Sequence, residues 1–209
     1  MRTTMTGQLK FNLGLGLTLV ALALAACKGD APVPPAAPAV PAATDTAAAT
    51  AATTRAKAAL KPLKEGLMGA LKAALAAGPP ADAITVCRDQ APAIAAAASR
   101  GGVTVGRTSA KLRNPNNAPR PWLAPLLAEY NGKRAGEAPP SRVVPLPDGG
   151  FGYVEPIFTA PLCAACHGAT LDPAVETRLT ALYPSDQARG YAEGDLRGLF
   201  WAEVAPTAP

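Results

Sequence analysis

The sequence predicts an α+β domain, because segments with helical periodicity come first and strand-like segments follow. Residues 55–99 place apolar side chains at helical spacing, whereas residues 142–158 form two strand-like runs around the turn signal Pro-Asp-Gly-Gly. A Cys-x-x-Cys-His motif at 163–167 directly follows the second run. Residues 55–209 have the normal length of one domain and contain no internal repeat, so we expect a single folded unit there.

The first 26 residues are typical of a bacterial lipoprotein signal peptide. Arg2 and Lys10 give a positive start, and residues 11–26 are apolar but too short and too rich in Gly and Ala for a membrane span of about 20 residues. The segment ends in Leu-Ala-Ala before Cys27, so we expect cleavage after residue 26 and lipidation of Cys27. An ordinary secretory signal with an unmodified Cys27 is the alternative, and both interpretations export the protein.

These features predict a periplasmic protein that a lipid anchors to a membrane. Lys28, rather than Asp, follows the cysteine, which favours the outer membrane in a Gram-negative host. Residues 28–54 consist almost entirely of Ala, Pro and Thr and bury too little surface to offset their ordering entropy. We therefore expect residues 27–54 to be a lipidated cysteine followed by an extended linker, and residues 55–209 to be the folded domain.

Two helices are expected at the start of that domain. Residues 55–77 carry leucines on one helical face, with Pro62 near the expected start of the helix, where proline is tolerated. A second helix is expected over 81–99, where Pro92 should remove one backbone hydrogen bond and kink it. The leucines of the first face are Leu60, Leu63, Leu67, Leu71 and Leu75.

The rest of the domain is expected to contain four strands and two further helices. Alternation and turn signals give the boundaries of these segments. The expected elements are a strand at 103–107, an ordered loop at 112–121, a helix at 122–130, strands at 142–146 and 151–158, a helix at 173–183 and a strand at 198–204.

The motif Cys163-Ala-Ala-Cys166-His167 is typical of a c-type haem attachment site. The two thiols would add to the haem vinyl groups, and the adjacent imidazole of His167 would bind the iron as an axial ligand. The alternatives are a redox Cys-x-x-Cys pair or half of a zinc site. Zinc would need two more suitable ligands, and the chain has no second histidine. We therefore expect one covalently bound haem c.

The sixth iron ligand has two candidates, because His167 is the only histidine. Met68 is the only methionine that remains after signal removal, although a methionine on a helix next to an apolar face is more often a filler of the core. Cys87 is left without a disulfide partner once the other three cysteines are assigned. It is either a buried, inert cysteine or an axial thiolate.

Charge distribution and donor groups suggest further contacts. Residues 55–142 contain 14 Lys and Arg against 5 Asp and Glu, whereas residues 143–209 contain 3 against 8. The basic half could contact an acidic redox partner, lipid headgroups or haem propionates, or could be an ordinary solvated surface. Nucleic acid is not expected as a partner. The candidate propionate partners are Arg107, Arg113 and Arg197, with Asn114 and Asn117 as further hydrogen-bond donors.

Several further short motifs follow one another along the chain. They are Ala-Ile-Thr-Val-Cys at 83–87, Ala-Pro-Ala-Ile-Ala at 91–95, Arg-Asn-Pro and Asn-Ala-Pro within 113–119, Cys-x-x-Cys-His-Gly at 163–168, Tyr-Pro-Ser-Asp at 183–186, and Gly-Tyr and Gly-Asp-Leu-Arg-Gly within 190–198. In these motifs, residues 55–205 resemble a bacterial haem-domain family long without an assigned function, found as exported cytochromes and as sensor domains of membrane histidine kinases.

The resemblance implies a PAS-like α+β fold and a haem held between His167 and a cysteine that corresponds to Cys87. The chain carries no kinase module, so we expect a separate module that is not an enzyme: a membrane-tethered monohaem cytochrome for electron transfer or redox sensing, with an unidentified redox or signalling partner. A sensor of NO or CO is the alternative. A peroxidase-like enzyme is the weakest alternative, because the chain offers no second histidine as an acid–base group.

Overall fold

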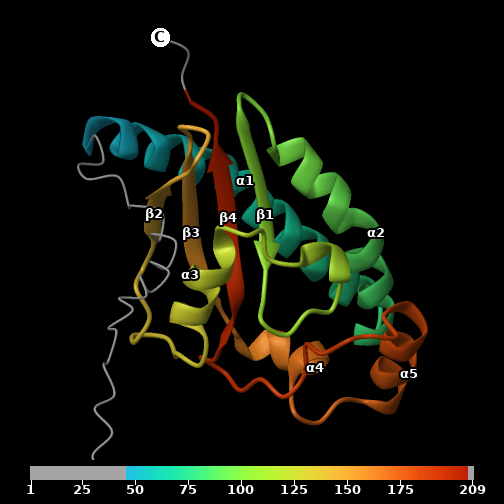
Figure 1. The fold of residues 1–209 in the computed structure, drawn as a ribbon. Coiled ribbons are helices and arrows are strands. Elements are labelled where there is room, and N and C mark those ends of the chain that lie inside the picture. The colour runs from blue at the N-terminus through green and yellow to red at the C-terminus, as the bar shows by residue number, and fades with distance from the viewer. Residues whose placement is uncertain (1–45, 207–209) are drawn as a thin grey trace, which may run out of the picture. The chain divides into compact units, whose positions relative to one another are not determined.

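The computed structural model describes residues 46–206, which fold around one four-stranded antiparallel sheet in the order β1-β4-β3-β2 (Figure 1). The expected signal peptide, Cys27 and most of the expected linker lie outside the described residues. The long helices α1 and α2 cover one face of the sheet and the short helix α3 lies on the other. The predicted α+β class, with N-terminal helices and an antiparallel sheet, is confirmed.

The sheet is built from strands that are distant in the sequence. The strands are β1 (Val103–Thr108), β2 (Arg142–Pro145), β3 (Phe151–Phe158) and β4 (Leu196–Val204). The predicted hairpin is present, since β2 pairs with β3 and the N–H of Leu146 donates to the carbonyl of Gly150 over 2.8 Å. The last strand lies between β1 and β3, with Val204 opposite both Val103 and Phe151. The C-terminal strand therefore joins the N-terminal and central parts of the domain.

Helix α1 (Thr46–Ala77) begins well before the expected boundary at Arg55. The sequence interpretation assigned residues 46–54 to an extended linker, and this is wrong for those residues. Alanine has the highest helix propensity of all residues, and Ala52, which is 4% exposed, packs against the sheet. The composition suggested that this segment could not contribute to a core, but the small side chain of Ala52 does so. Pro62 consequently lies inside the helix rather than near its start.

Helices α2, α3 and α5 agree with the predicted segments to within a few residues, whereas the short helices η1, η2 and α4 were not predicted. Helix α2 (Pro80–Ala98) contains Pro92 and begins with prolines at its first turn. It is followed by η1 (Pro115–Asn117), α3 (Leu123–Tyr130), η2 (Pro161–Cys163), α4 (Ala164–His167) and α5 (Pro173–Leu182). None of the helices between residues 46 and 206 is both long and apolar enough to cross a membrane.

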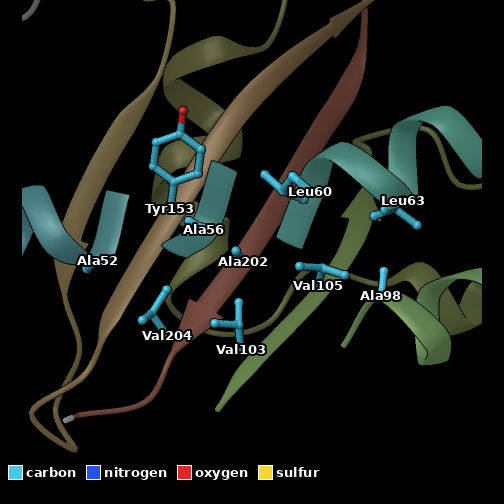
Figure 2. Close-up of a cluster of buried hydrophobic side chains, with 10 residues drawn as sticks. All are labelled: Ala52, Ala56, Leu60, Leu63, Ala98, Val103, Val105, Tyr153, Ala202 and Val204. Atoms are coloured by element: carbon cyan, nitrogen blue, oxygen red, sulfur yellow. The ribbon is translucent and has the colours of Figure 1, made fainter. Parts of the chain in front are cut away.

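Alternation along the strands divides the core between the two faces of the sheet. Tyr153 and Ala202 point toward α1, whereas Val154 and Trp201, their neighbours in the chain, point toward α3. Figure 2 shows the first cluster, in which side chains of α1 lie over the inner strands. The cluster consists of Ala52, Ala56, Leu60, Leu63, Ala98, Val103, Val105, Tyr153, Ala202 and Val204. This packing holds α1 against the sheet.

Candidate functional site

A cavity of about 460 Å³ lies where the C-terminal half of α1, α2, β1, β4 and the Cys-x-x-Cys-His segment meet. Its volume lies within the range of sites for small molecules and cofactors, roughly 300–1,000 Å³. Leu63, Leu67, Leu71 and Leu75 of the predicted helical face contribute to its apolar wall. The predicted site residues Cys87, Arg107, Arg113, Asn114, Cys163, Cys166, His167 and Arg197 all line it. Folding thus brings together residues that span more than half of the sequence.

The Cys-x-x-Cys-His motif forms a short helical turn on the cavity wall. Cys163 ends η2, and α4 carries Cys166 and His167. Both cysteines are free thiols. Gly168 ends α4, and a Cβ atom at this position would lie 2.6 Å from the carbonyl oxygen of Ala164. The glycine after the histidine is therefore required for the chain to turn away from the motif.

The imidazole of His167 is oriented by the protein backbone. Its Nδ1 lies 2.8 Å from the carbonyl oxygen of Ala188, which can only accept, so Nδ1 carries the proton and donates it. Burial lowers the pKa of His167 to about 3, and the positive charges of Arg197 and Arg113 act in the same direction. The ring is therefore neutral at physiological pH. The lone pair on Nε2 is free to bind a metal, the arrangement usual for metal-binding histidines.

Arg113 and Asp186 form a buried ion pair behind the motif. The Arg113 guanidinium donates to Asp186 over 3.0 Å and to the carbonyl oxygens of Cys166 and Ala188 over 2.5 and 3.2 Å. Sequence analysis predicted Arg113 as a propionate partner. The structure shows that its Nε and Nη2 groups already bind protein acceptors, so its observed role is to hold the motif against the loop that contains Ala188.

The thiol of Cys87 lies on α2 and lines the same cavity as the motif. Burial raises its pKa, and the positive charges of Arg107 and Arg113 oppose that rise. Burial raises the pKa of Cys166, and the charge of Cys87 acts in the same direction. Cys87 is a free thiol in the structure. Met68, the other candidate ligand, also lines the cavity, but its side chain is 42% exposed, so Met68 lies at the rim of the cavity.

Two guanidinium groups on the cavity wall have no carboxylate held against them by the described residues. Arg107 is exposed at the cavity, and desolvation by the surrounding protein lowers its pKa, while the charges acting on it come from Cys87, Tyr183 and Arg113. Burial likewise lowers the pKa of Arg197, whose Nε is buried without a hydrogen-bond partner among the described residues. Arg107 and Arg197 are thus suited to bind an anionic group of a ligand in this cavity.

The two predicted asparagine donors have structural roles in the loop after β1. The Oδ1 of Asn114 accepts the N–H of Asn116 over 2.9 Å and caps η1. The carbonyl of Asn117 accepts the hydroxyl of Thr108 over 2.8 Å. Both asparagines line the cavity. The capping bond uses only the oxygen of the Asn114 amide, so its NH₂ group is still available as a donor toward the cavity.

Sequence reasoning missed three residues that complete the site. Asp186 belongs to a quoted motif but received no role, and Ala188 was not considered at all. The sequence gives no signal for Ala188, because its carbonyl acts through the backbone and any residue would supply it. Tyr191 also contacts the site: its ring meets the His167 ring edge-on with centroids 6.4 Å apart, and Lys111 and Arg197 lie 5.0 and 5.2 Å from its centroid.

The geometry argues against the zinc alternative. Between residues 46 and 206, no group of three or more His, Cys, Asp or Glu side chains is placed to hold a metal ion. The cavity instead offers one imidazole, three thiols, two guanidiniums without a carboxylate partner, and an apolar wall. This set of groups fits a large, flat, partly anionic cofactor better than a bare ion.

Comparison with known proteins gives one family and one solved structure. Residues 37–204 match the family model described as Tll0287-like. The crystal structure of the cyanobacterial haem protein Tll0287 aligns with a TM-score of 0.52 and 25% sequence identity, over 80% of this chain and 99% of that chain. A comparison with curated protein sequences found no match.

Proposed function

The chain belongs to the Tll0287-like family, whose model covers residues 37–204, and we propose on this basis that it is a monohaem c-type cytochrome for electron transfer or redox sensing. The related structure is that of a haem protein. The observation that carries the proposal is that one cavity is lined by the attachment cysteines, the axial histidine, a further thiol and unpaired guanidiniums. This membership agrees with the resemblance that the sequence motifs indicated.

Each of these groups has a task in holding the haem. The Cys163 and Cys166 thiols would each add across one vinyl group, with the sulfur on one carbon and the proton on the other, so no oxidant is consumed. The neutral Nε2 of His167 would occupy one axial position. Arg107 and Arg197 would pair with the propionates, because charge-assisted hydrogen bonds to carboxylates are the strongest that a side chain makes. A bound haem supplies an iron that accepts and releases one electron.

The proposed sixth ligand is Cys87. It is the one thiol of the cavity outside the attachment motif, whereas Met68 lies at the exposed rim. A thiolate donates charge to the iron and stabilises the ferric state, so a His/Cys cytochrome should have a lower reduction potential than a His/Met cytochrome. A low potential suits either an electron donor or a redox sensor.

One observation favours a gas-sensing role as the second candidate. Burial and the charges of Arg107 and Arg113 act on the Cys87 thiol, and no hydrogen bond to it is found among residues 46–206. A sulfur that is held only by the iron and by its own helix could leave on reduction and make room for CO or NO. A peroxidase-like activity has less support, because the chain has no histidine besides His167 to act as acid or base. We therefore propose a non-catalytic role.

The cellular setting also belongs to the proposal. We propose that the chain is exported, lipidated on Cys27 and held at a membrane, the outer membrane in a Gram-negative host, where it exchanges electrons or signals with a partner protein. The sequence of residues 1–28 supports this part of the proposal. Labelling of Cys27 with a fatty-acid analogue, absent in Cys27→Ala, would test it.

The decisive experiment is low-temperature EPR of the ferric protein matured with the haem attachment machinery, beside Cys87→Ala. We expect a low-spin signal of the thiolate type that is absent in the variant. Met68→Leu serves as the matched control and should leave the signal unchanged. A high-spin signal in the wild type, or one that Cys87→Ala does not alter, would contradict His167/Cys87 ligation.

A further inference from the structure

The loop that follows α5 is bound directly to the haem-attachment motif. Besides the bond from His167 Nδ1 to Ala188, the N–H of Tyr191 donates to the carbonyl of His167 and the N–H of Gly190 to the carbonyl of Gly168, each over 3.0 Å. The orientation of the imidazole therefore depends on how this loop is held.

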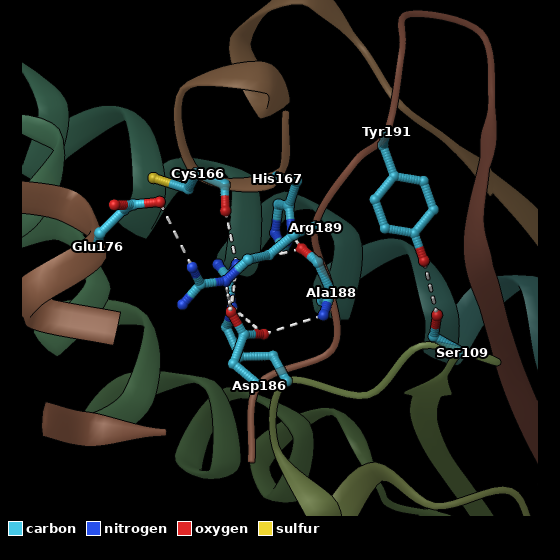
Figure 3. Close-up of polar contacts among 9 residues, drawn as sticks. Ser109, Cys166, His167, Glu176, Asp186, Ala188, Arg189 and Tyr191 are labelled. Carbon is cyan, nitrogen blue, oxygen red and sulfur yellow. Dashed lines mark hydrogen bonds and ion pairs between the residues drawn. The ribbon is translucent and has the colours of Figure 1, made fainter. Parts of the chain in front are cut away.

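Asp186 is the group that holds the loop (Figure 3). Its side chain is 1% exposed and accepts from the N–H of Ala188 over 3.0 Å, from Arg113 over 3.0 Å and from Arg189 over 2.9 Å. Burial acts to raise the pKa of Asp186, but the donors of Arg113, Ala188 and Arg189 outweigh it and lower that pKa below its ordinary value. The buried group is therefore a carboxylate with its oxygens occupied.

The carbonyl oxygen of Ala188 accepts from two donors, His167 Nδ1 over 2.8 Å and Arg113 Nη2 over 3.2 Å. The hydrogen bond at Nδ1 sets the tautomer and orientation of a metal-binding histidine, and a stronger acceptor there makes the ring a stronger electron donor to the metal. A cationic donor on the same oxygen withdraws electron density from it. Arg113 should thus weaken the pull of the carbonyl on the Nδ1 proton.

We propose that Asp186 and Arg113 are positioning residues for His167: Asp186 fixes the Ala188 carbonyl that accepts the Nδ1 proton, and Arg113 limits how strongly that carbonyl polarises the ring. This inference rests on the proposed haem-binding function. It goes further, because it gives a role to the buried Arg113–Asp186 ion pair. The pair would control how much negative charge His167 donates to the iron and, through it, the reduction potential.

A merely structural ion pair would stabilise the loop without changing the bond at Nδ1, so the test must observe that bond. The single histidine of the chain makes this possible, because ¹⁵N-histidine labelling of untagged protein gives one pair of ring nitrogen signals. The experiment compares full-length haem-loaded wild type with Arg113→Gln, Arg113→Lys and Asp186→Asn. The ¹H and ¹⁵N chemical shifts of the Nδ1–H group and its hydrogen-exchange rate are recorded in the ferrous protein. If the ferrous haem is not low-spin as isolated, CO is added first to make it so. Reduction potentials are measured in parallel.

In Arg113→Gln we expect the signal of the Nδ1 proton to move downfield and the reduction potential to fall. The reason is that the Ala188 carbonyl then accepts a hydrogen bond from His167 but no longer from Arg113. In Asp186→Asn we expect Nδ1–H exchange to accelerate about tenfold, the scale of losing one hydrogen bond of ordinary net strength. Arg113→Lys keeps the charge but cannot bridge the carbonyls of Cys166 and Ala188. It should therefore alter the Nδ1–H shift and would reveal the same role if Arg113→Gln failed to mature.

Two variants separate this effect from general electrostatics. Arg88→Gln and Lys72→Gln each remove an exposed positive charge, from α2 and α1 respectively, and neither side chain contacts the loop at residues 186–191. Both should leave the Nδ1–H shift as in the wild type. Unchanged Nδ1–H signals in all three test variants, or equal changes in the two controls, would overturn the proposal. Wild type without any bound haem would overturn the proposed function and this inference together.

Discussion

The guanidinium of Arg107 and the thiol of Cys87 line one cavity, and the positive charge of the first opposes the rise in pKa that burial imposes on the second. Arg107 lies on β1 and Cys87 on α2, so the pairing depends on how the helix crosses the sheet. A cation near a thiol favours its thiolate, which is the form that binds iron. Burial outweighs this charge effect, so the pKa of Cys87 remains above its ordinary value and the free thiol is neutral. The guanidinium of Arg107 nevertheless reduces the cost of forming the thiolate that the proposed iron ligation needs.

Replacing Cys87 by methionine is expected to raise the reduction potential. A thioether donates less negative charge than a thiolate, so the ferric state loses stabilisation relative to the ferrous state. The measurement is a spectroelectrochemical titration of wild type and Cys87→Met, with Met68→Leu as the matched control that should retain the wild-type potential. A reduction potential that changes in Met68→Leu but not in Cys87→Met would identify Met68 as the ligand.

Replacing Cys163 or Cys166 by alanine is expected to remove one thioether each, and the double variant should carry no covalent haem. Each thiol lines the cavity and is free to react. The check is haem-dependent peroxidase staining after denaturing electrophoresis, together with intact mass. Cys87→Ala is the control, since an axial ligand is lost on denaturation and its absence should leave the covalent haem in place. Equal staining of the double variant and wild type would rule out attachment through this motif.

Replacing Arg197 by glutamine is expected to lower the reduction potential. The Nε of Arg197 is buried without a described partner, so a propionate would supply the acceptor that the protein does not. Removing the cation leaves the carboxylate charge uncompensated, which favours the ferric state. The control is Arg100→Gln, because Arg100 is exposed and does not line the cavity. A potential equal to that of the wild type in Arg197→Gln would show that the guanidinium does not face a propionate.

Replacing Ala52 by glutamate is expected to destabilise the domain by about 2–4 kcal/mol, because it places a charge against the sheet. Ala52 is 4% exposed, whereas the adjacent Ala51 is exposed, so Ala51→Glu is a matched control that should change stability by less than about 0.5 kcal/mol. Urea unfolding followed by circular dichroism measures both. Equal stabilities of the two variants would mean that the first turns of α1 do not pack against the sheet. That outcome would agree with the linker that the sequence interpretation assigned to these residues.

Acid is expected to destabilise the domain partly through Asp186. The pKa of this carboxyl is lower in the folded protein than its ordinary value of about 3.9, so the folded state binds its proton less readily than the unfolded chain does. The stabilisation that the ionised Asp186 contributes to the folded state is therefore fully present above about pH 4. It is lost as the pH falls through the pKa of Asp186 in the folded protein. Unfolding free energies from pH 7 to pH 2 should decline less steeply in Asp186→Asn. Glu65→Gln, at a side chain that is 67% exposed, should keep the wild-type slope.

Helical and strand periodicity predicted the regular elements of the domain, because residues 3.6 or 2 apart share a face whatever the rest of the chain does. The helical face at Leu60 and Leu63 is buried as expected, and the hairpin at 146–150 is present. The start of α1 could not be read in the same way. Alanine carries little hydrophobic signal, so a buried Ala52 looks the same as an exposed one until the sheet beneath it is known.

The sequence by itself determined which reactive groups the chain can bring to the site. Cys163, Cys166 and His167 are neighbours in the chain, and a single histidine and a leftover Cys87 limit the possible ligands by counting alone. Only the tertiary structure decided which groups share the cavity and what each is free to do. It paired Arg113 with Asp186, left the Nε of Arg197 without a hydrogen-bond partner among the described residues, and placed the Ala188 carbonyl against His167. The physical reason is that side-chain type is local information, whereas burial and hydrogen-bond partners depend on segments that meet only when the chain folds.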